Sequence, residues 1–177
     1  MILSIKLENL IQTNTFATNI AKVLPHKITI VFNGDLGAGK TTLIKNIIQS
    51  YGVSGNIKSP TYTLVETYHT PISIIIHHFD LYRFHDENEW LDAGFDEYFT
   101  QTNTICLIEW PIRAMRLIPE IDWVVDIHIL NSENLINNTN QEQERHMDYH
   151  PSRMVTITPH TPIGHECIRK LKSIMKC

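Results

Sequence analysis

Residues 34–41 constrain the fold of this chain more than any other feature. Their sequence, GDLGAGKT, fits the pattern G-x-x-x-x-G-K-[ST] at every fixed position. In such a loop the glycines let backbone N–H groups turn inward, so that they form a nest for phosphate oxygens at the start of a helix. The flanking sequence has the required form, because 27–32 predicts a buried strand and 40–51 predicts a helix with an apolar face. The sequence therefore predicts a P-loop.

The pattern gives each loop residue an expected role. We expect the phosphates of ATP or ADP to lie against Gly37, Ala38, Gly39, Lys40, Thr41 and Thr42. The Lys40 ammonium is expected to reach the β- and γ-phosphates, and the Thr41 hydroxyl is expected to bind Mg²⁺. For Thr42, an ordinary place in the first helical turn is the alternative. For the whole motif the alternative is a glycine-rich turn without a ligand, against which the flanking strand and helix argue.

Two carboxylates are placed to complete such a site. Asp80 directly follows the predicted strand 73–79, and Glu109 directly follows the predicted strand 104–108. Ligands of open α/β sheets collect at the carboxyl ends of strands, so both side chains are candidates for the metal and for catalysis. A surface ion pair at a strand end is the alternative for each.

The remaining pattern predicts an α/β fold, a single P-loop NTPase domain over residues 1–177. We expect a mostly parallel central sheet with flanking helices and an antiparallel edge hairpin formed by strands 123–130 and 154–158. The other expected elements are strands at 62–68 and 73–79, a helix from Phe16 to about residue 24 with Thr13 or Asn14 as its N-cap, and short helical segments at 87–91, 95–99 and 113–117.

Two segments of the second half stand out by composition. Residues 131–150 are rich in Asn, Gln and Glu, so we expect a mobile surface loop inserted in the hairpin. Residues 164–176 place Ile168, Leu171 and Ile174 on one side of a helix, which predicts an amphipathic C-terminal helix. Packing on the core is its expected role, and membrane or partner binding is the alternative.

Composition excludes several classes of protein. The net charge of −4 gives no basic field for non-specific binding of nucleic acid. Cys106, Cys167 and Cys177 are few and odd in number, which suits neither a disulfide framework nor a zinc site. His77 and His78 would point to opposite faces of a strand, so they cannot chelate one metal. The N-terminus lacks a secretory pattern and the apolar runs are too short for a bilayer, so we expect a cytoplasmic protein with no membrane contact.

Five stretches together resemble the TsaE family, also called YjeE, the small ATPases of tRNA threonylcarbamoyladenosine synthesis. They are 34–43 (GDLGAGKTTL), 58–66 (KSPTYTLVE), 78–83 (HFDLYR), 94–99 (GFDEYF) and 105–111 (ICLIEWP). The resemblance covers about residues 10–130, and SPTYTLVE together with HFDLYR is far more specific than the P-loop alone.

The resemblance implies roles for individual residues. Thr41 and Glu109 would bind Mg²⁺, and Asp80 would be the acid required for hydrolysis, so that Asp80, Glu109 and Lys40 make up the expected catalytic set. Trp110 is implied to be functionally important, with simple packing as the alternative.

Three further parts of the chain receive an implied role from the family. Residues 59–66 resemble its switch loop, with Thr61 on the γ-phosphate side. Residues 7–13 would border the adenine. Arg153 would correspond to a basic residue on the returning strand.

The resemblance also implies a function and partners. The chain would hydrolyse ATP with Mg²⁺, slowly by itself because no arginine finger except Arg83 can be assigned within it. Hydrolysis would reset the TsaD–TsaB transferase complex, which modifies the adenosine that follows the anticodon in ANN-decoding tRNAs. Contact with tRNA would be indirect, through that complex.

Three other functions are compatible with a P-loop. A small-molecule kinase would need a lid with arginines and an acceptor pocket, for which Arg113 and Arg116 are thin support. A GTPase would need an NKxD-type motif, which the sequence lacks. An assembly module would bind ATP with negligible hydrolysis. Phosphate release, acceptor screening and partner stimulation distinguish these functions.

Overall fold

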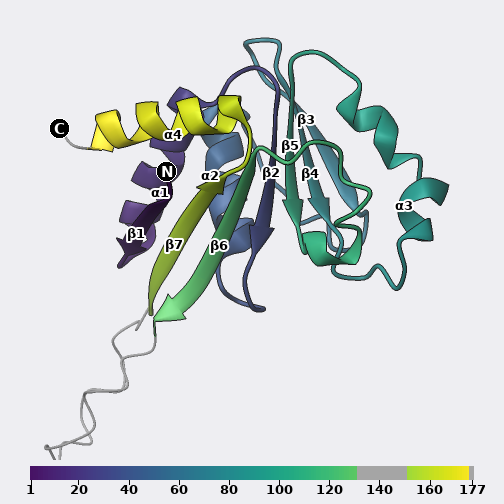
Figure 1. Cartoon of the computed structure of the whole chain (residues 1–177), viewed down its shortest axis with the longest axis horizontal. Coiled ribbons are helices and arrows are strands. Elements are labelled where there is room, and N and C mark those ends of the chain that lie inside the picture. The colour runs from purple at the N-terminus through teal and green to yellow at the C-terminus, as the bar shows by residue number, and fades with distance from the viewer. Residues whose placement is uncertain (131–150, 176–177) are drawn as a thin grey trace, which may run out of the picture.

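A computed structural model describes residues 1–130 and 151–175 of the chain. Those residues form one seven-stranded sheet with helices on its faces (Figure 1). The strands are β1 (Leu3–Leu7), β2 (Ile28–Asn33), β3 (Val65–His69), β4 (Ile75–Asp80), β5 (Thr104–Glu109), β6 (Trp123–Leu130) and β7 (Ser152–Pro159). The helices are α1 (Leu10–Val23), α2 (Lys40–Ser50), α3 (Asn88–Asp92) and α4 (Pro162–Met175), with 3₁₀ turns η1 (Phe95–Phe99) and η2 (Pro111–Arg113).

The sheet has a parallel centre and antiparallel flanks. Its strand order is β1-β7-β6-β2-β5-β4-β3. Strands β6, β2, β5 and β4 are parallel neighbours, while β7 pairs antiparallel with β6, and β3 with β4. Every residue of β5 is buried, as expected for a central strand covered on both faces. The predicted parallel centre and the hairpin of β6 and β7 are confirmed, in a P-loop NTPase fold.

The N-terminal strand β1 was not predicted, and it changes the edge of the sheet. It pairs antiparallel with β7, from Leu3 opposite Ile157 to Leu7 opposite Arg153. The hairpin of β6 and β7 therefore lies one strand inside the edge. Leu3 and Leu7 are buried and alternate with exposed residues, which is the pattern of a strand with one covered face.

The predicted starts of α1 and β3 are wrong, and η2 ends at Arg113, where the predicted helical segment 113–117 begins. Helix α1 begins at Leu10 and not at Phe16, and its N-cap is Asn9, whose side chain accepts a hydrogen bond from the Gln12 N–H at 2.9 Å. Strand β3 begins at Val65 and not at residue 62, because Leu64 has a φ of 66° and its N–H donates to Pro60 O at 2.7 Å. The chain turns there, and it cannot extend the ladder.

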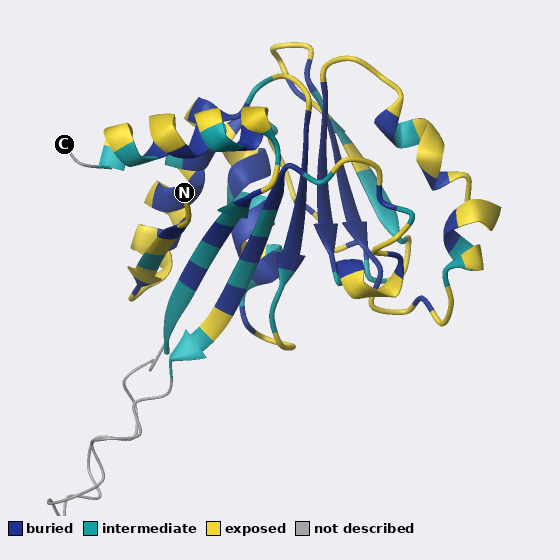
Figure 2. Cartoon of the chain, viewed as in Figure 1, coloured by how far each residue is buried: buried dark blue, intermediate teal, exposed yellow. Residues whose placement is uncertain are grey.

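The two faces of the sheet have different cores. Helices α1, α2 and α4 cover one face with an aliphatic core that includes Ile30, Ile44 and Leu171. The segment after β4 covers the other face, where Phe79, Trp90 and neighbouring rings form an aromatic core. Figure 2 shows the central strands buried between these layers.

The sequence also predicts a C-terminal helix and a loop at 131–150 in the second half of the chain. Helix α4 buries Cys167, Ile168 and Leu171 against the aliphatic core. The loop expected at 131–150 lies outside the described residues. Within residues 1–130 and 151–175, the longest helices have 14 residues, and none is long and apolar enough to span a bilayer.

Candidate functional site

The P-loop joins β2 to α2 at the carboxyl edge of the parallel strands. Gly34 has a φ of 143°, and a Cβ at this position would lie 2.5 Å from the backbone oxygen of Ile127 on β6. Gly39 is the N-cap of α2 with a φ of 107°. The two fixed glycines of the pattern therefore serve different needs, one the close approach of two backbones and the other a left-handed turn into the helix.

Lys40 folds back over the loop. Its ammonium donates to the backbone oxygens of Gly34 at 2.6 Å and Asp35 at 3.0 Å, and it lies 3.9 Å from the centre of the Trp110 ring. Burial lowers the pKa of Lys40, while the carboxylates of Glu109, Asp80 and Asp35 act in the opposite direction. A buried cation held by neutral carbonyls and an aromatic face is suited to receive an anion.

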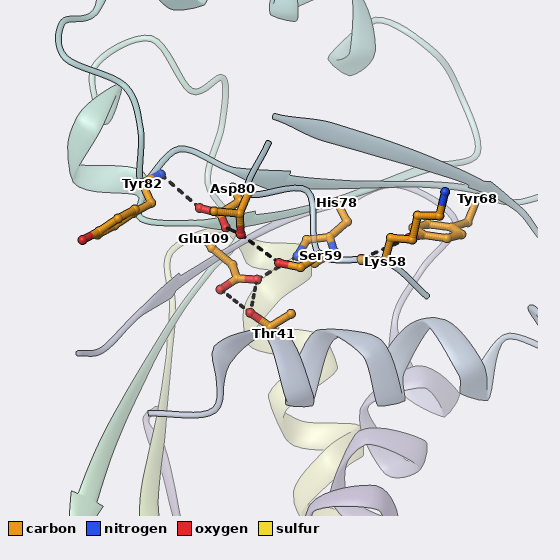
Figure 3. A network of polar contacts seen from close by, with 9 residues as sticks. Thr41, Lys58, Ser59, Tyr68, His78, Asp80, Tyr82 and Glu109 are labelled. Carbon is orange, nitrogen blue, oxygen red and sulfur yellow. Dashed lines mark hydrogen bonds and ion pairs between the residues drawn. The ribbon is translucent and has the colours of Figure 1, made fainter. Parts of the chain in front are cut away.

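Thr41 and Glu109 meet across the cleft, as Figure 3 shows. The Thr41 hydroxyl lies 2.8 Å and 2.9 Å from the two carboxylate oxygens of Glu109. Glu109 ends β5, and Phe32 of β2 is its partner in the sheet, so the parallel pairing of these strands brings the carboxylate to the P-loop. The helix start and the strand end therefore place both expected metal ligands together.

The donor set of this cleft suits Mg²⁺. Thr41, Glu109 and Asp80 offer a hydroxyl and carboxylate oxygens, the ligands that Mg²⁺ prefers. Over the described ranges, no group of three or more His, Cys, Asp or Glu side chains could by itself hold a metal ion.

Asp80 connects the neighbouring loop to the end of β4. Its carboxylate accepts hydrogen bonds from the Thr61 hydroxyl at 2.6 Å and from the Tyr82 N–H at 3.0 Å. The Ser59 and Thr61 hydroxyls are 2.9 Å apart, and the Asp80 N–H donates to Leu64 O. The loop at 59–66 is therefore attached to the same carboxylate that stands beside Glu109 in the sheet register.

The cleft has a volume of about 250 Å³. Its lining is Leu36, Gly37, Gly39, Lys40, Thr41, Thr42, Thr61, Asp80, Tyr82, Glu109 and Trp110. Of the residues predicted to bind the phosphates or Mg²⁺ or to be catalytic, only Ala38 is absent from the lining, and its side chain is buried in the core. The structure brings all the others together.

Arg153 and the start of α1 lie at the same edge of the sheet. The Arg153 Nε donates to Ala38 O at 3.0 Å, and Arg153 pairs with Leu7 in the sheet. Leu7 is therefore the sheet partner of the residue that contacts the P-loop backbone. The adenine border at residues 7–13 stays a prediction. Arg83 lies with its guanidinium carbon 4.4 Å from the centre of the Tyr62 ring.

The sequence interpretation missed His78, whose Nε2 lies 2.9 Å from Glu109 Oε1 (Figure 3). A signal was present, because His78 and Asp80 are two residues apart in one strand and therefore share a face. His77 lies on the other face, where its Nδ1 is 2.8 Å from the Thr67 hydroxyl. The two histidines do point apart, as expected.

Comparison with known proteins agrees with this geometry. The family model described as "Threonylcarbamoyl adenosine biosynthesis protein TsaE" matches residues 7–143. A tRNA threonylcarbamoyladenosine biosynthesis protein TsaE of Haemophilus influenzae is 48% identical over 113 residues, covering 63% of this chain and 70% of that protein. The protein of the same name from Rickettsia bellii is 33% identical over 132 residues, covering 74% and 90%. The protein of that name from Bacillus subtilis is 41% identical over 91 residues, covering 51% and 55%.

A solved structure supports the fold. The crystal structure of Bacillus subtilis YdiB superposes with a TM-score of 0.75 at 21% identity and covers 99% of this chain and 97% of that chain. At this identity the likeness speaks for the fold alone. The family model covers well over half of the sequence, and the residues that line the cleft fall within its match, so the chain belongs to the TsaE family of threonylcarbamoyl adenosine biosynthesis proteins.

Proposed function

We propose that the chain is a magnesium-dependent ATPase that supports threonylcarbamoylation of the adenosine following the anticodon in ANN-decoding tRNAs. The contact between Thr41 and Glu109 carries the proposal, because a P-loop hydroxyl bonded to a strand-end carboxylate is the arrangement that P-loop NTPases use around their metal. The names of the relatives supply the pathway.

The residues of the cleft have separate tasks in this proposal. The backbone N–H groups from Gly37 to Thr42 hold the phosphates, and Lys40 neutralises charge on the β- and γ-phosphates. Thr41 and Glu109 would hold Mg²⁺, which neutralises the charge that develops on the phosphate oxygens. Asp80 orients Thr61, and through it the loop that borders the γ-phosphate side, so that the attacking water is held in line.

The rim of the cleft supports a partner-dependent reaction. Leu36, Tyr62 and Ile112 are 77%, 82% and 74% exposed, and each lies in or next to a segment that lines the cleft. We infer that these exposed apolar side chains belong to a surface that another protein covers. We propose that the TsaD–TsaB complex covers it and that ATP hydrolysis resets that complex. Contact with tRNA is then indirect.

Arg83, the candidate arginine finger, does not point its guanidinium group at the cleft in this conformation. Its guanidinium lies against Tyr62, so it is engaged by the loop at 59–66. Turnover by the chain alone should therefore be slow. A cation supplied by a partner is worth about 10³–10⁵ in kcat for other P-loop enzymes, so stimulation by more than about tenfold is expected.

Phosphate release from Mg-ATP tests the proposal. It is measured for the chain alone, for the purified TsaD–TsaB complex alone and for the mixture, with Lys40→Ala as the inactive control. Equal release by the mixture and by the sum of its parts would remove the partner-dependent cycle. Transfer of the phosphate to a hydroxyl acceptor in place of water would support a kinase.

A further inference from the structure

A buried histidine stands behind the proposed metal ligand. His78 is fully buried on β4, and its Nε2 lies 2.9 Å from Oε1 of Glu109, which is itself 2% exposed. We propose that His78 is a positioning residue that fixes the Glu109 carboxylate in the orientation that holds Mg²⁺. This inference rests on the proposed metal role of Glu109.

The sheet register explains how His78 reaches Glu109. Asp80 of β4 stands opposite Glu109 of β5, and His78 stands opposite Leu107. Side chains two residues apart share a face of a strand, so His78 and Asp80 both project toward the side on which Glu109 meets Thr41 (Figure 3). The ring therefore approaches the carboxylate along the strand direction, from the side away from the cleft mouth.

The two partners of Glu109 cannot substitute for each other. The Thr41 hydroxyl has one proton and lies within hydrogen-bonding distance of both carboxylate oxygens, so it does not by itself select one rotation of the carboxylate. It is also the group expected to bind the metal. His78 contacts Oε1 alone, and its ring is held in a buried site. It is therefore the contact that fixes the orientation of the carboxylate plane.

The chemistry of the ring suits this role. The second nitrogen, Nδ1, is buried and has no hydrogen-bond partner among the described residues. The tautomer with its proton on Nε2 then satisfies Glu109 without placing an unpaired N–H in the core. Groups that orient metal ligands in this way typically change metal affinity by about 10–100-fold when they are replaced.

The magnesium dependence of ADP binding tests the proposal. The dissociation constant of ADP is measured with excess EDTA and with saturating Mg²⁺. The value in EDTA divided by the value in Mg²⁺ is then compared between variants. His78→Leu removes the donor and should reduce the ratio by about tenfold or more while leaving binding in EDTA unchanged. His78→Gln retains an N–H at similar reach and should stay within about threefold of the natural chain. His77→Leu, on the opposite face of the same strand, is the matched control and should leave the ratio unchanged.

The outcomes separate this inference from the proposed function. An unchanged ratio in folded His78→Leu would overturn the positioning role alone. A ratio near one in the natural chain would overturn the metal site itself. If His78→Leu lacks native circular dichroism, His78→Gln is compared with His78→Asn, whose amide is one methylene too short to reach Glu109. A reduced ratio in His78→Asn but not in His78→Gln supports the positioning role of His78, and equal ratios in both variants refute it. Direct Mn²⁺ binding followed by electron paramagnetic resonance should give the same ranking.

Discussion

The ammonium group of Lys40 lies 3.9 Å from the centre of the Trp110 ring. This contact combines with the hydrogen bonds that Lys40 donates to the backbone of Gly34 and Asp35, so the side chain is folded over its own loop. Trp110 in turn contacts Tyr82, with the ring centres 5.0 Å apart and the ring planes tilted by 53°. Binding of phosphate must therefore change the surroundings of the Trp110 indole.

We predict that Mg-ADP changes the intrinsic fluorescence of the chain and that Trp110→Phe abolishes most of this change. The other tryptophans, Trp90 and Trp123, are fully buried in the two cores, where nucleotide would not contact them. Fluorescence titration checks this, with calorimetry to show that the variant still binds. A Trp110→Phe protein that binds ADP and gives the full signal would mean that the nucleotide is sensed elsewhere.

The contact between Thr61 and Asp80 predicts a separation of binding from turnover. Asp80→Ala should retain Mg-ADP affinity within about threefold and lose on the order of 100-fold in partner-stimulated turnover, because the loop at 59–66 loses its attachment to the strand end. Thr61→Val removes only the hydroxyl, and it should lower turnover by about tenfold. The measurements are steady-state phosphate release and nucleotide affinity.

Thr63→Val is the matched control for this prediction. Thr63 lies in the same loop, but its hydroxyl donates to Glu66 at 2.9 Å and does not contact Asp80. Its turnover should stay near that of the natural chain. If Thr61→Val and Thr63→Val behave alike, the attachment of the loop to Asp80 is not required.

His77 predicts a loss of stability in acid. Burial lowers the pKa of His77 to about 4, and His69 acts in the same direction. The His77 ring packs edge-on against Tyr98, with the ring centres 4.7 Å apart. The Nε2 atom of His77 is buried and has no hydrogen-bond partner among the described residues. Since the unfolded chain takes up this proton near pH 6.5, the stabilisation is complete above that value and is lost as the pH falls toward 4.

The expected loss is on the order of 3 kcal/mol over this range, since the pKa is lowered from 6.5 to about 4 and one pKa unit corresponds to about 1.4 kcal/mol. Urea unfolding of the natural chain and of His77→Leu is compared at several pH values between 4 and 7. As the pH falls, the unfolding free energy of the natural chain should decrease more than that of His77→Leu. Parallel curves would show that the ring is not kept neutral.

The parts of the fold that the sequence predicts well depend on residues that are close together in the chain. The run at 27–32, the glycines at 34, 37 and 39 and the apolar face of 40–51 are neighbours in the chain, so one strand–loop–helix unit can be inferred directly. The strand ends that carry Asp80 and Glu109 follow from their apolar runs. Their place beside Thr41 follows from the rule that ligands collect at one edge of a parallel sheet.

The missed features depend on partners distant in sequence or on exposed residues. Leu10 and Ile11 are 50% and 76% exposed, so the first turn of α1 lacks the buried apolar face from which a helix is inferred. Strand β1 is five residues long, and it is stabilised by β7, about 150 residues further along the chain. The contact of His78 with Glu109 requires the register between β4 and β5, which neither strand specifies by itself.

Gly164 provides a test of how closely α4 packs on the sheet. Replacing a glycine by alanine within a helix normally stabilises it by about 1 kcal/mol. Here a Cβ would lie 2.5 Å from the backbone oxygen of Asp122, and 3.1 Å from Cδ1 of Trp123. The Trp123 Nε1 also donates to Gly164 O at 2.9 Å, so the helix cannot move away without losing this bond.

We therefore predict that Gly164→Ala destabilises the chain by about 1–3 kcal/mol, against the usual helix propensity, because the added methyl overpacks a backbone contact. Arg169→Ala, at an exposed position of the same helix, should change the free energy of unfolding by less than about 0.5 kcal/mol. Urea unfolding measures both. A more stable Gly164→Ala protein would mean that α4 stands further from Asp122, and the anchoring of α4 through Trp123 would then have to be abandoned.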